Sequence, residues 1–228
     1  MQKTETRRWR IKGPEMEGPI ARWYARVRGT SSQIEAYRRQ ALDLTAGLRG
    51  GAQVLEVAPG PGYLAIEMAR LGRFGVTGLD ISHTFVEIAS ENALHQRVRV
   101  DFRQGDAAQM PFAASTFDLI VCQAAFKNFP LPLSALGEMH RVLCAGGGAV
   151  IQDMSHDATH ADIDHEVKAM DLGWWSTFTT RATLETLKRR AYSSAQLQRL
   201  VAQSPFQTCE ITIQGIGLEV GLKKGATL

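Results

Sequence analysis

Residues 54–65 read VLEVAPGPGYLA, and this stretch decides the fold. Its apolar start predicts a short buried strand, and the periodicity after Gly62 predicts a helix. The glycines at positions 60 and 62 let the backbone approach a ligand closely, and a helix that opens at Gly62 turns its free N–H groups toward the same point. A strand, a glycine turn and a helix in this order are typical of the first unit of a nucleotide-binding α/β sheet, although a glycine loop alone is weak support.

Strands and helices alternate after this stretch. Hydrophobic periodicity predicts strands over residues 53–57, 74–79, 98–102, 117–122 and 147–152, and helices over residues 63–71, 82–95 and 133–143. The strand at 117–122 is nearly all apolar, which is typical of a parallel strand buried on both faces. Alternation at this pitch predicts an α/β fold with a doubly wound, mostly parallel sheet and right-handed crossovers.

The flanking segments indicate a single domain, residues 1–228, in four parts. These are an N-terminal helical cover (1–49), the core (50–153), a helical insertion (154–204) and a C-terminal β-hairpin (205–228). Within the insertion we expect helix throughout 155–190 and again over 193–202. In the last part, alternating runs at 210–214 and 216–222 are so close together that they predict an antiparallel pair.

The composition, with 228 residues, a net charge of +3 and 44% hydrophobic residues, fits a soluble globular chain. No apolar run approaches the ~20 residues that span a bilayer, and no apolar segment follows the basic start as in a signal peptide. Cys122, Cys144 and Cys209 form no CxxC pair, so we expect neither disulfides nor a thiolate zinc site and infer a reducing, cytoplasmic setting. Residues 1–49 carry a net charge of +6, but the basic residues are scattered, so nucleic acid is not an expected partner.

Acidic residues near strand ends add to the glycine signal. Asp80 lies 20 residues past Gly60, the spacing at which an acidic residue meets the hydroxyls of a bound ribose. A helix N-cap is the alternative role, but Ser82 is better placed for it. Because Asp80 ends a strand, we expect its replacement to leave the fold intact. Glu56, inside an apolar strand, would be costly to bury unless it meets backbone donors or a cation, so we expect a functional partner for it.

Four ordered motifs between residues 53 and 153 resemble the class I S-adenosylmethionine-dependent methyltransferases. The motifs are VLEVAPGPGYLA, GVTGLDIS, GDAAQMPFAASTFDLIVCQAAFKNF and EMHRVLCAGGGAVIQD. The resemblance is to the small-molecule branch related to the ubiquinone and menaquinone C-methyltransferases. It implies a seven-stranded Rossmann-like sheet with an antiparallel seventh strand next to the fifth. It also implies S-adenosyl-L-methionine as cofactor and methyl transfer to a small-molecule acceptor by direct in-line displacement.

The resemblance also implies a set of cofactor-binding residues at the carboxyl ends of the strands. The set is Glu56, Ala58, Pro59, Gly60, Gly62, Asp80, Ile81, Asp106, Ala107, Cys122, Gln123 and Phe126. The loop glycines would lie under the methionine part, Glu56 would orient the loop and the methionyl amino group, and Asp80 would hold the ribose. Ile81 would pack on the adenine ring, whose amino group would meet Asp106, and Ala107 would offer its N–H group. The last three residues would line the methyl-donating end.

The chain departs from the family pattern at two places. Ala58 stands where members commonly have glycine, and we expect Pro59 to hold residue 58 extended, a conformation in which a Cβ fits without strain. Lys127 and Asn128 stand where many small-molecule relatives carry two histidines, so the family's acceptor is not carried over.

Acceptor-binding candidates come from the flanking helices and from the end of the fourth strand. They are Tyr24, Lys127, Asn128 and Trp174. The two aromatic residues either close over the strand ends and hold a planar or apolar acceptor, or fill the seam between helices and sheet. Lys127 either holds an anionic group or extends to solvent. No catalytic residue is identified, and Lys127, Asp153 and His156 are candidate bases if the acceptor must lose a proton.

Three alternative interpretations remain open at this stage. A nicotinamide-dependent dehydrogenase tolerates Ala65 at the third glycine position, but residues 153–228 offer no clear substrate domain. A non-catalytic module that binds protein or RNA could keep the fold, but the glycine loop and Asp80 are intact. His156 and His160 lie among carboxylates and suggest a metal ligand pair, but no second pair occurs at zinc spacing, so we expect no metal.

Overall fold

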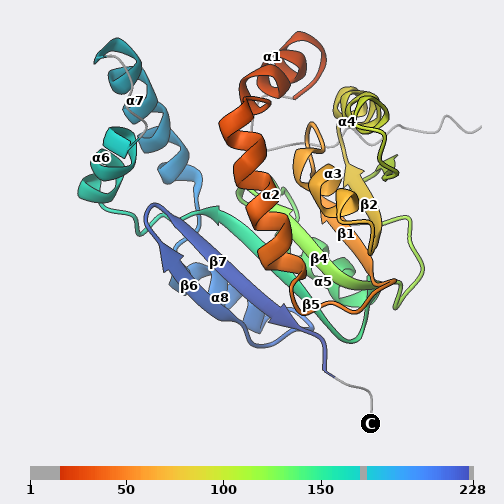
Figure 1. Ribbon diagram of the computed structural model, residues 1–228. Helices are drawn as coiled ribbons and strands as arrows, with labels where there is room; N and C mark the ends of the chain where they lie inside the picture. Colours follow the sequence, from red (N-terminus) through yellow and green to blue (C-terminus); the bar gives the residue numbers. More distant parts are fainter. Residues whose placement is uncertain (1–15, 170–173, 226–228) are drawn as a thin grey trace, which may run out of the picture.

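The computed structural model describes residues 16–169 and 174–225, and these contain one mixed sheet with helices around it (Figure 1). The strands are β1 (Gln53–Val57), β2 (Gly75–Asp80), β3 (Asp101–Gln104), β4 (Phe117–Gln123), β5 (Leu143–Met154), β6 (Glu210–Gln214) and β7 (Gly217–Lys223). The helices are α1 (Gly18–Arg28), α2 (Ser31–Thr45), α3 (Tyr63–Arg70), α4 (His83–His95), α5 (Pro132–Val142), α6 (His160–Ala169), α7 (Trp174–Arg190) and α8 (Ser194–Ala202), with a 3-10 turn η1 (Phe126–Asn128).

The strand order is β3-β2-β1-β4-β5-β7-β6. Strands β1 to β5 run parallel, and β7 pairs antiparallel with both β5 and β6. The predicted fold class is therefore confirmed, including an antiparallel seventh strand next to the fifth. The order reverses between β1 and β4, and open α/β sheets bind ligands outside the carboxyl ends at such a point.

Hydrophobic layers cover both faces of the sheet. Helices α5 and α8 cover one face, and helices α2 and α3 cover the other. Within β1, Leu55 packs toward α5 and α8, whereas Val54 packs toward α2 and α3. Because successive side chains of a strand point to opposite faces, β1 and β4 are apolar on both sides. Packing on both faces therefore fixes the carboxyl ends of β1 and β4, which form the expected ligand-binding edge.

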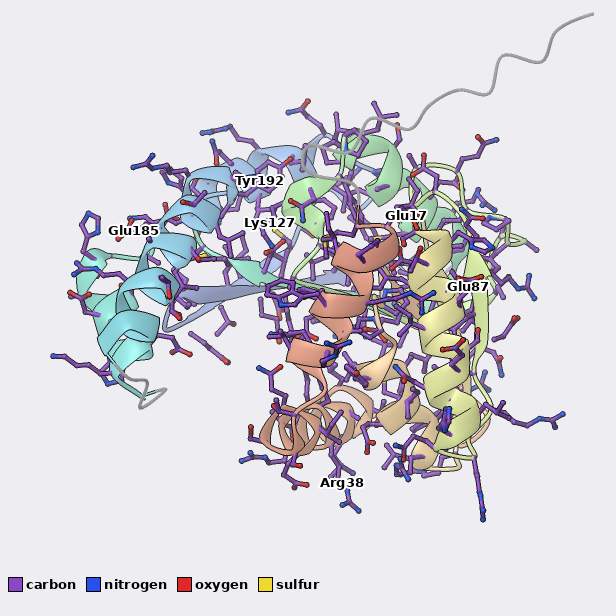
Figure 2. The ribbon with its side chains drawn as sticks, turned by 90° about the horizontal axis from the view of Figure 1, so that it is seen from above. Glu17, Arg38, Glu87, Lys127, Glu185 and Tyr192 are labelled. Atoms are coloured by element: carbon purple, nitrogen blue, oxygen red, sulfur yellow. The ribbon has the colours of Figure 1, made fainter. Side chains whose placement is uncertain are left out.

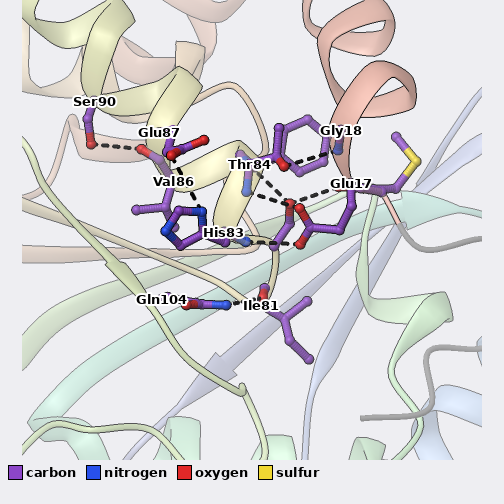
Figure 3. A network of polar contacts seen from close by, with 12 residues as sticks. Glu17, Gly18, Ile81, His83, Thr84, Val86, Glu87, Ser90 and Gln104 are labelled. Atoms are coloured by element: carbon purple, nitrogen blue, oxygen red, sulfur yellow. Dashed lines mark hydrogen bonds and ion pairs between the residues drawn. The ribbon is translucent and has the colours of Figure 1, made fainter. Parts of the chain in front are cut away.

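Helix α1 is anchored to the start of α4 by the residue that precedes it (Figure 3). The Glu17 carboxylate accepts hydrogen bonds from the backbone N–H groups of His83 (3.0 Å) and Thr84 (3.1 Å), and the Gly18 N–H group donates to Oγ1 of Thr84 (3.0 Å). The first N–H groups of a helix lack partners within it and favour negative charge, so Glu17 caps α4. Burial raises the pKa of Glu17, but these hydrogen bonds together bring it below its ordinary value. The buried face of α1 packs on Phe85.

Two predicted strand boundaries are wrong. The strand expected at 98–102 runs from Asp101 to Gln104, because only these residues pair with the end of β2, and a turn with Arg97 at φ 56° precedes them. The strand expected at 147–152 extends from Leu143 to Met154, because a register shift beside β4 adds a pair between Leu143 and Phe117.

The prediction of continuous helix over 155–190 is also wrong. Residues 155–159 form a turn, and α6 begins at His160, where the Thr159 N–H group donates to the Asp162 carboxylate (2.7 Å) and the Asp162 N–H group donates to Oγ1 of Thr159 (3.1 Å). Helices α6 and α7 stand apart from α1 in both Figure 1 and Figure 2. Trp174 begins α7, but its side chain lies outside the described residues.

Ala58 is not extended, in contrast to the expectation from Pro59. Its φ is 57°, in the left-handed region, and its N–H group donates to the carbonyl of Leu79 (2.7 Å). This hydrogen bond to β2 fixes the turn out of β1 and overrides the local preference for an extended residue before proline. In this conformation a Cβ approaches the following carbonyl oxygen, which costs roughly 1–2 kcal/mol.

We therefore expect Ala58→Gly to raise the free energy of unfolding by about 0.5–1 kcal/mol, because relief of strain exceeds the entropy that a glycine adds to the unfolded chain. Chemical unfolding checks this expectation. Ala114→Gly is the matched control, since Ala114 is exposed in a loop and is not among the residues with positive φ. It should destabilise slightly, and equal effects of the two substitutions would contradict the strain at Ala58.

Candidate functional site

Asp80 joins two loops at the ligand-binding edge. Its Oδ2 atom accepts a hydrogen bond from the Gly60 N–H group (2.9 Å), and its Oδ1 atom accepts one from the Ser82 N–H group (2.9 Å). The residue is only 5% exposed. Burial raises the pKa of its carboxyl to about 6, against the effect of these hydrogen bonds. Because its removal would leave the N–H groups of Gly60 and Ser82 without this partner, we expect its replacement to lower stability, and the expectation that the fold itself stays intact remains a prediction.

The loop glycines have different reasons to be glycine. Both have positive φ, +55° at Gly60 and +78° at Gly62. A Cβ at Gly62 would lie 2.6 Å from Cζ of Phe102 and 2.8 Å from Cβ of Ala89, whereas a Cβ at Gly60 would meet nothing within 4 Å. Gly62 therefore lets β3 and α4 pack on the loop, while Gly60 leaves open space above the backbone.

We expect Gly62→Ala to cost about 2–5 kcal/mol in the free energy of unfolding, because overpacking adds to strain. Gly60→Ala should cost only the strain, about 1–2 kcal/mol. Chemical unfolding of the two variants isolates the contribution of packing by difference. Equal losses would show that the contact with Phe102 relaxes without cost.

Glu56 is a buried acid that lacks a complete set of partners. It is 3% exposed, and its Oε2 atom is buried with no hydrogen-bond partner. Burial raises the pKa of Glu56 to about 8, the backbone N–H group of Ala65 lowers it, and the nearby Asp80 raises it further. A carboxylate in this state gains most from a cationic ligand group. The sequence predicted a functional partner for Glu56, and the described part of the chain supplies no cation that pairs with its carboxyl group.

A small cavity adjoins these residues. It encloses about 50 Å³ and is lined by Tyr24, Arg28, Tyr37, Glu56, Ala58, Pro59, Gly60, Pro61, Tyr63, Leu64, Gln123 and Ala124. The first three lining residues come from α1 and α2, so the N-terminal helices lie directly over the glycine loop. Pockets for drug-sized ligands enclose roughly 300–1,000 Å³. A nucleoside can enter here only if some of these side chains move.

The buried carboxyl of Glu56 should make stability depend on pH. Between its ordinary pKa of 4.5 and the pKa of about 8 in the folded chain, the folded state holds a proton that the unfolded state has released. The free energy of unfolding therefore falls as pH rises through this window, by about 1 kcal/mol per unit between about pH 6 and 8. Glu56→Gln should remove this slope and be the more stable chain at pH 8. Chemical unfolding across pH tests this, with Glu35→Gln on the exposed side of α2 as the control that keeps the slope.

The other predicted cofactor residues lie in different surroundings. Asp106 accepts a hydrogen bond from the Ala108 N–H group through Oδ1 (2.9 Å) and closes a local turn. Ala107 packs at the edge of the core, and Ile81 is half-buried. Buried hydrophobic residues surround Cys122 and Phe126, and burial raises the pKa of the Cys122 thiol. The roles of these residues toward a cofactor stay predictions.

A larger pocket lies at the carboxyl ends of β4 and β5, near the labelled Lys127 and Tyr192 in Figure 2. It encloses about 420 Å³ and is lined by Lys127, Arg189, Arg190, Ala191, Tyr192 and Gln196. Sequence reasoning did not identify Tyr192, Arg189 or Arg190 as site residues. Only the fold brings them beside η1, so no local signal was available.

Lys127 is neither a solvent-directed nor a free cation. Its Nζ atom donates to Oδ1 of Asp153 (2.6 Å) and to the carbonyl of Ala124 (2.7 Å), and its backbone N–H group donates to Oδ2 of Asp153 (3.0 Å). The Lys127 side chain is 6% exposed and that of Asp153 is 7% exposed. The two sequence expectations for Lys127 are thus corrected: burial excludes extension to solvent, and the ammonium group already has a carboxylate partner.

Asn128 and His156, two further acceptor and base candidates, contact residues that line the larger pocket. Nη2 of Arg190 donates to Oδ1 of Asn128 (3.1 Å), and the Tyr192 ring packs on Phe126 with 6.0 Å between centroids. Burial raises the pKa of Tyr192, and the Asp153 charge raises it further. His156 is exposed, and its backbone N–H group donates to the carbonyl of Tyr192 (3.0 Å).

Several histidine and carboxylate side chains of residues 156–165 make hydrogen bonds or ion pairs with neighbouring side chains. His160 contacts the carboxylate of Glu185, Asp162 bonds Thr159, and Asp164 pairs with Arg181 (3.1 Å). No group of three potential metal ligands occurs among residues 16–169 and 174–225.

The fold and this site define a class I methyltransferase, and comparison with known proteins places the chain in that class. Residues 48–201 match the family model described as a methyltransferase domain. A demethylmenaquinone methyltransferase of Deinococcus radiodurans is 31% identical over 122 residues, which are 53% of this chain and 51% of that protein. The chain thus belongs to the methyltransferase domain family, whose class I members use S-adenosyl-L-methionine, and it resembles the menaquinone-type members. It spans about half the length of the curated relatives that it matches.

Solved structures share the fold at low sequence identity. A SAM-dependent methyltransferase from Aquifex aeolicus superposes with a TM-score of 0.66 at 17% identity, covering 88% of this chain and 97% of that one. The cyclase SpnF superposes with a TM-score of 0.57 at 18% identity, covering 87% of this chain and 84% of that one. None of the helices that the structure describes is long and apolar enough to cross a bilayer.

Proposed function

We propose that the chain transfers a methyl group from S-adenosyl-L-methionine to a small-molecule acceptor by direct in-line displacement. The observation that carries the proposal is the buried, incompletely bonded Glu56 beside an open glycine backbone and Asp80. The cofactor has a cationic amino group and a ribose diol, and these are the groups that a buried carboxylate and a strand-end carboxylate would bind.

The residues at the small cavity fit this cofactor. Glu56 would hold the amino group, and Asp80 has acceptor capacity left for hydroxyl groups, because a carboxylate offers about four lone-pair positions and two are in use. Gly60 would let the backbone approach the ligand, and Tyr24 and Tyr37 would cover it. When bound, the cofactor supplies a methyl group on a positively charged sulfur.

The larger pocket is the proposed site of the acceptor. The two cavities share the end of β4, because Ala124 lines the small one and its carbonyl accepts a hydrogen bond from Lys127, which lines the large one. Lys127 and Asp153 form an ion pair, so their proposed role is to fix the chain after β4 rather than to remove a proton from the acceptor. Positioning of two reactants can supply about 7–11 kcal/mol of a barrier. Family membership gives no support to the dehydrogenase alternative, and the intact acidic site speaks against a non-catalytic module.

Asp80→Asn should weaken binding of S-adenosyl-L-methionine by about 10- to 100-fold, because charge-assisted hydrogen bonds to the ribose contribute roughly 1.5–3 kcal/mol each. It should also lower the free energy of unfolding by about 1–2 kcal/mol, because an amide cannot accept from two N–H groups through both of its atoms. Titration calorimetry and chemical unfolding measure the two effects. Asp101→Asn, at an exposed acid paired with Arg103, is the control with unchanged affinity. A folded Asp80→Asn chain with wild-type affinity would refute the ribose assignment.

Transfer itself is tested with isotopically methyl-labelled cofactor and a metabolite extract, followed by mass spectrometry. The wild-type chain should label an acceptor and Asp80→Asn should label far less. Cofactor binding without any labelled product would contradict methyl transfer and would favour another reaction on the same fold, since the similar SpnF is described as a cyclase.

A further inference from the structure

A chain of hydrogen-bonded side-chain amides crosses the sheet beneath α2. Glu219 of β7, Gln152 of β5 and Gln123 of β4 occupy directly paired positions, so their side chains share one face. Nε2 of Gln152 donates to Oε2 of Glu219 (2.7 Å). Gln40 of α2 donates to Oε1 of Gln152 and accepts from Nε2 of Gln123 (2.9 Å). This amide chain therefore runs from Glu219 through Gln152 and Gln40 to Gln123.

Glu219 fixes the direction of the amide chain. A carboxylate only accepts hydrogen bonds, whereas an amide has a donating and an accepting end. Gln152 must therefore turn its NH2 group to Glu219 and its oxygen to Gln40. The same constraint passes to Gln40 and then to Gln123, so Nε2 of Gln123 lies at Gln40 and its Oε1 atom is turned away. An amide chain without a charged end could run in either direction.

The last member of the amide chain lies at the small cavity. Gln123 lines this cavity together with Glu56. Glu56 pairs with Val121, two residues before Gln123, so both side chains lie on the face that α2 covers. Within residues 16–169 and 174–225, no hydrogen bond to Oε1 of Gln123 occurs. The direction of the amide chain thus decides whether Gln123 offers an oxygen or an NH2 group to a ligand.

We propose that Glu219 is a positioning residue that holds Gln123 with its oxygen toward the cavity, where this oxygen accepts a hydrogen bond from the cationic amino group of S-adenosyl-L-methionine. The part that concerns the ligand rests on the proposed function. An ammonium group has three donors, and the unpartnered oxygen of Glu56 serves one of them. A neutral amide oxygen adds an acceptor without a second buried charge beside Glu56.

The first test reads the direction of the amide chain from stability, without any ligand. Gln123→Glu gives the amide chain two ends that only accept, so its equilibrium constant of unfolding should rise at least tenfold, about 1.4 kcal/mol. Glu219→Lys replaces the accepting end by one that only donates. The double variant Glu219→Lys, Gln123→Glu therefore satisfies every member in the reverse direction. Chemical unfolding should show that Gln123→Glu costs at least tenfold less in the Glu219→Lys background.

The matched control for this cycle is Glu210→Lys. Glu210 is an exposed acid on β6 and pairs with Gly221, so it lies on the same face as Glu219 but outside the amide chain. Its charge reversal should leave the cost of Gln123→Glu unchanged. Additive effects of Glu219→Lys and Gln123→Glu would overturn the proposed direction. An equal gain in the Glu210→Lys background would also overturn it, because attraction between charges would then explain the coupling.

The second test concerns the ligand. Calorimetric titrations compare S-adenosyl-L-homocysteine, which carries the amino group, with 5′-methylthioadenosine, which lacks it. Glu219→Lys should weaken binding of the former at least tenfold and leave binding of the latter unchanged, because the reversed amide chain turns an NH2 group to the cavity. The double variant should restore the affinity, because Gln123→Glu supplies a carboxylate oxygen there, and Glu210→Lys should bind both ligands as the wild-type chain does.

The outcomes separate the role of Glu219 from the proposed function. Equal losses for both ligands in Glu219→Lys, or no loss for either, would overturn the positioning role and leave the amide chain as an attachment of α2 to the sheet. A lack of rescue in a folded double variant would overturn it as well. If neither ligand binds the wild-type chain, the proposed function is contradicted instead, and the stability cycle decides the direction of the amide chain alone.

Discussion

The site depends on one buried carboxylate that holds two loops together. Asp80 accepts from the glycine loop after β1 and from the turn after β2, at Gly60 and Ser82. Ser82 in turn caps α4 through the Phe85 N–H group, and its hydroxyl donates to the carbonyl of Met16 just before α1. A single series of hydrogen bonds thus runs from the sheet to the helix that covers the cavity. Because each member fixes the next, the position of the cover follows from the position of a strand end.

Two other buried acids of the site, Asp153 and Glu56, have opposite surroundings. Asp153 has a lysine partner and further backbone donors, so its charge is compensated by the chain itself. Glu56 has no such partner for one of its oxygens, and its pKa is raised to about 8. An unpaired buried carboxylate lowers stability. Such local violations of good packing chemistry are expected at functional sites, where the missing partner is the ligand.

The fold could be predicted from the sequence because its signals are local. The alternation of short apolar runs with helical periodicity predicted the bounds of β1 and β4 to within a residue. The glycine loop and Asp80 indicated the ligand-binding edge of the sheet. Predicted strand boundaries were wrong where strand pairing, rather than the hydrophobic pattern, determines the end of a strand. At β3 the first residue is set by the residues of β2 with which it pairs. The predicted extended conformation of Ala58 was wrong for a related reason, because its hydrogen bond to Leu79 on the neighbouring strand outweighs the effect of the proline that follows it. The larger pocket could be predicted only in part, because Lys127 pairs with Asp153 and Asn128 with Arg190, and these partners are distant in the sequence.

The antiparallel strand β7 lies between β5 and β6, although it follows both in the chain. During synthesis, the apolar edge of β5 therefore stays unpaired while α6, α7, α8 and β6 are being added. An open, apolar strand edge is a template for pairing with other chains, and pairing between distant segments is slow. Strand β7, the last strand that the structure describes, is thus an interior strand that pairs with β5 and β6. Chains stalled on the ribosome before residue 217 would carry an intact glycine loop and an exposed, aggregation-prone edge at the same time.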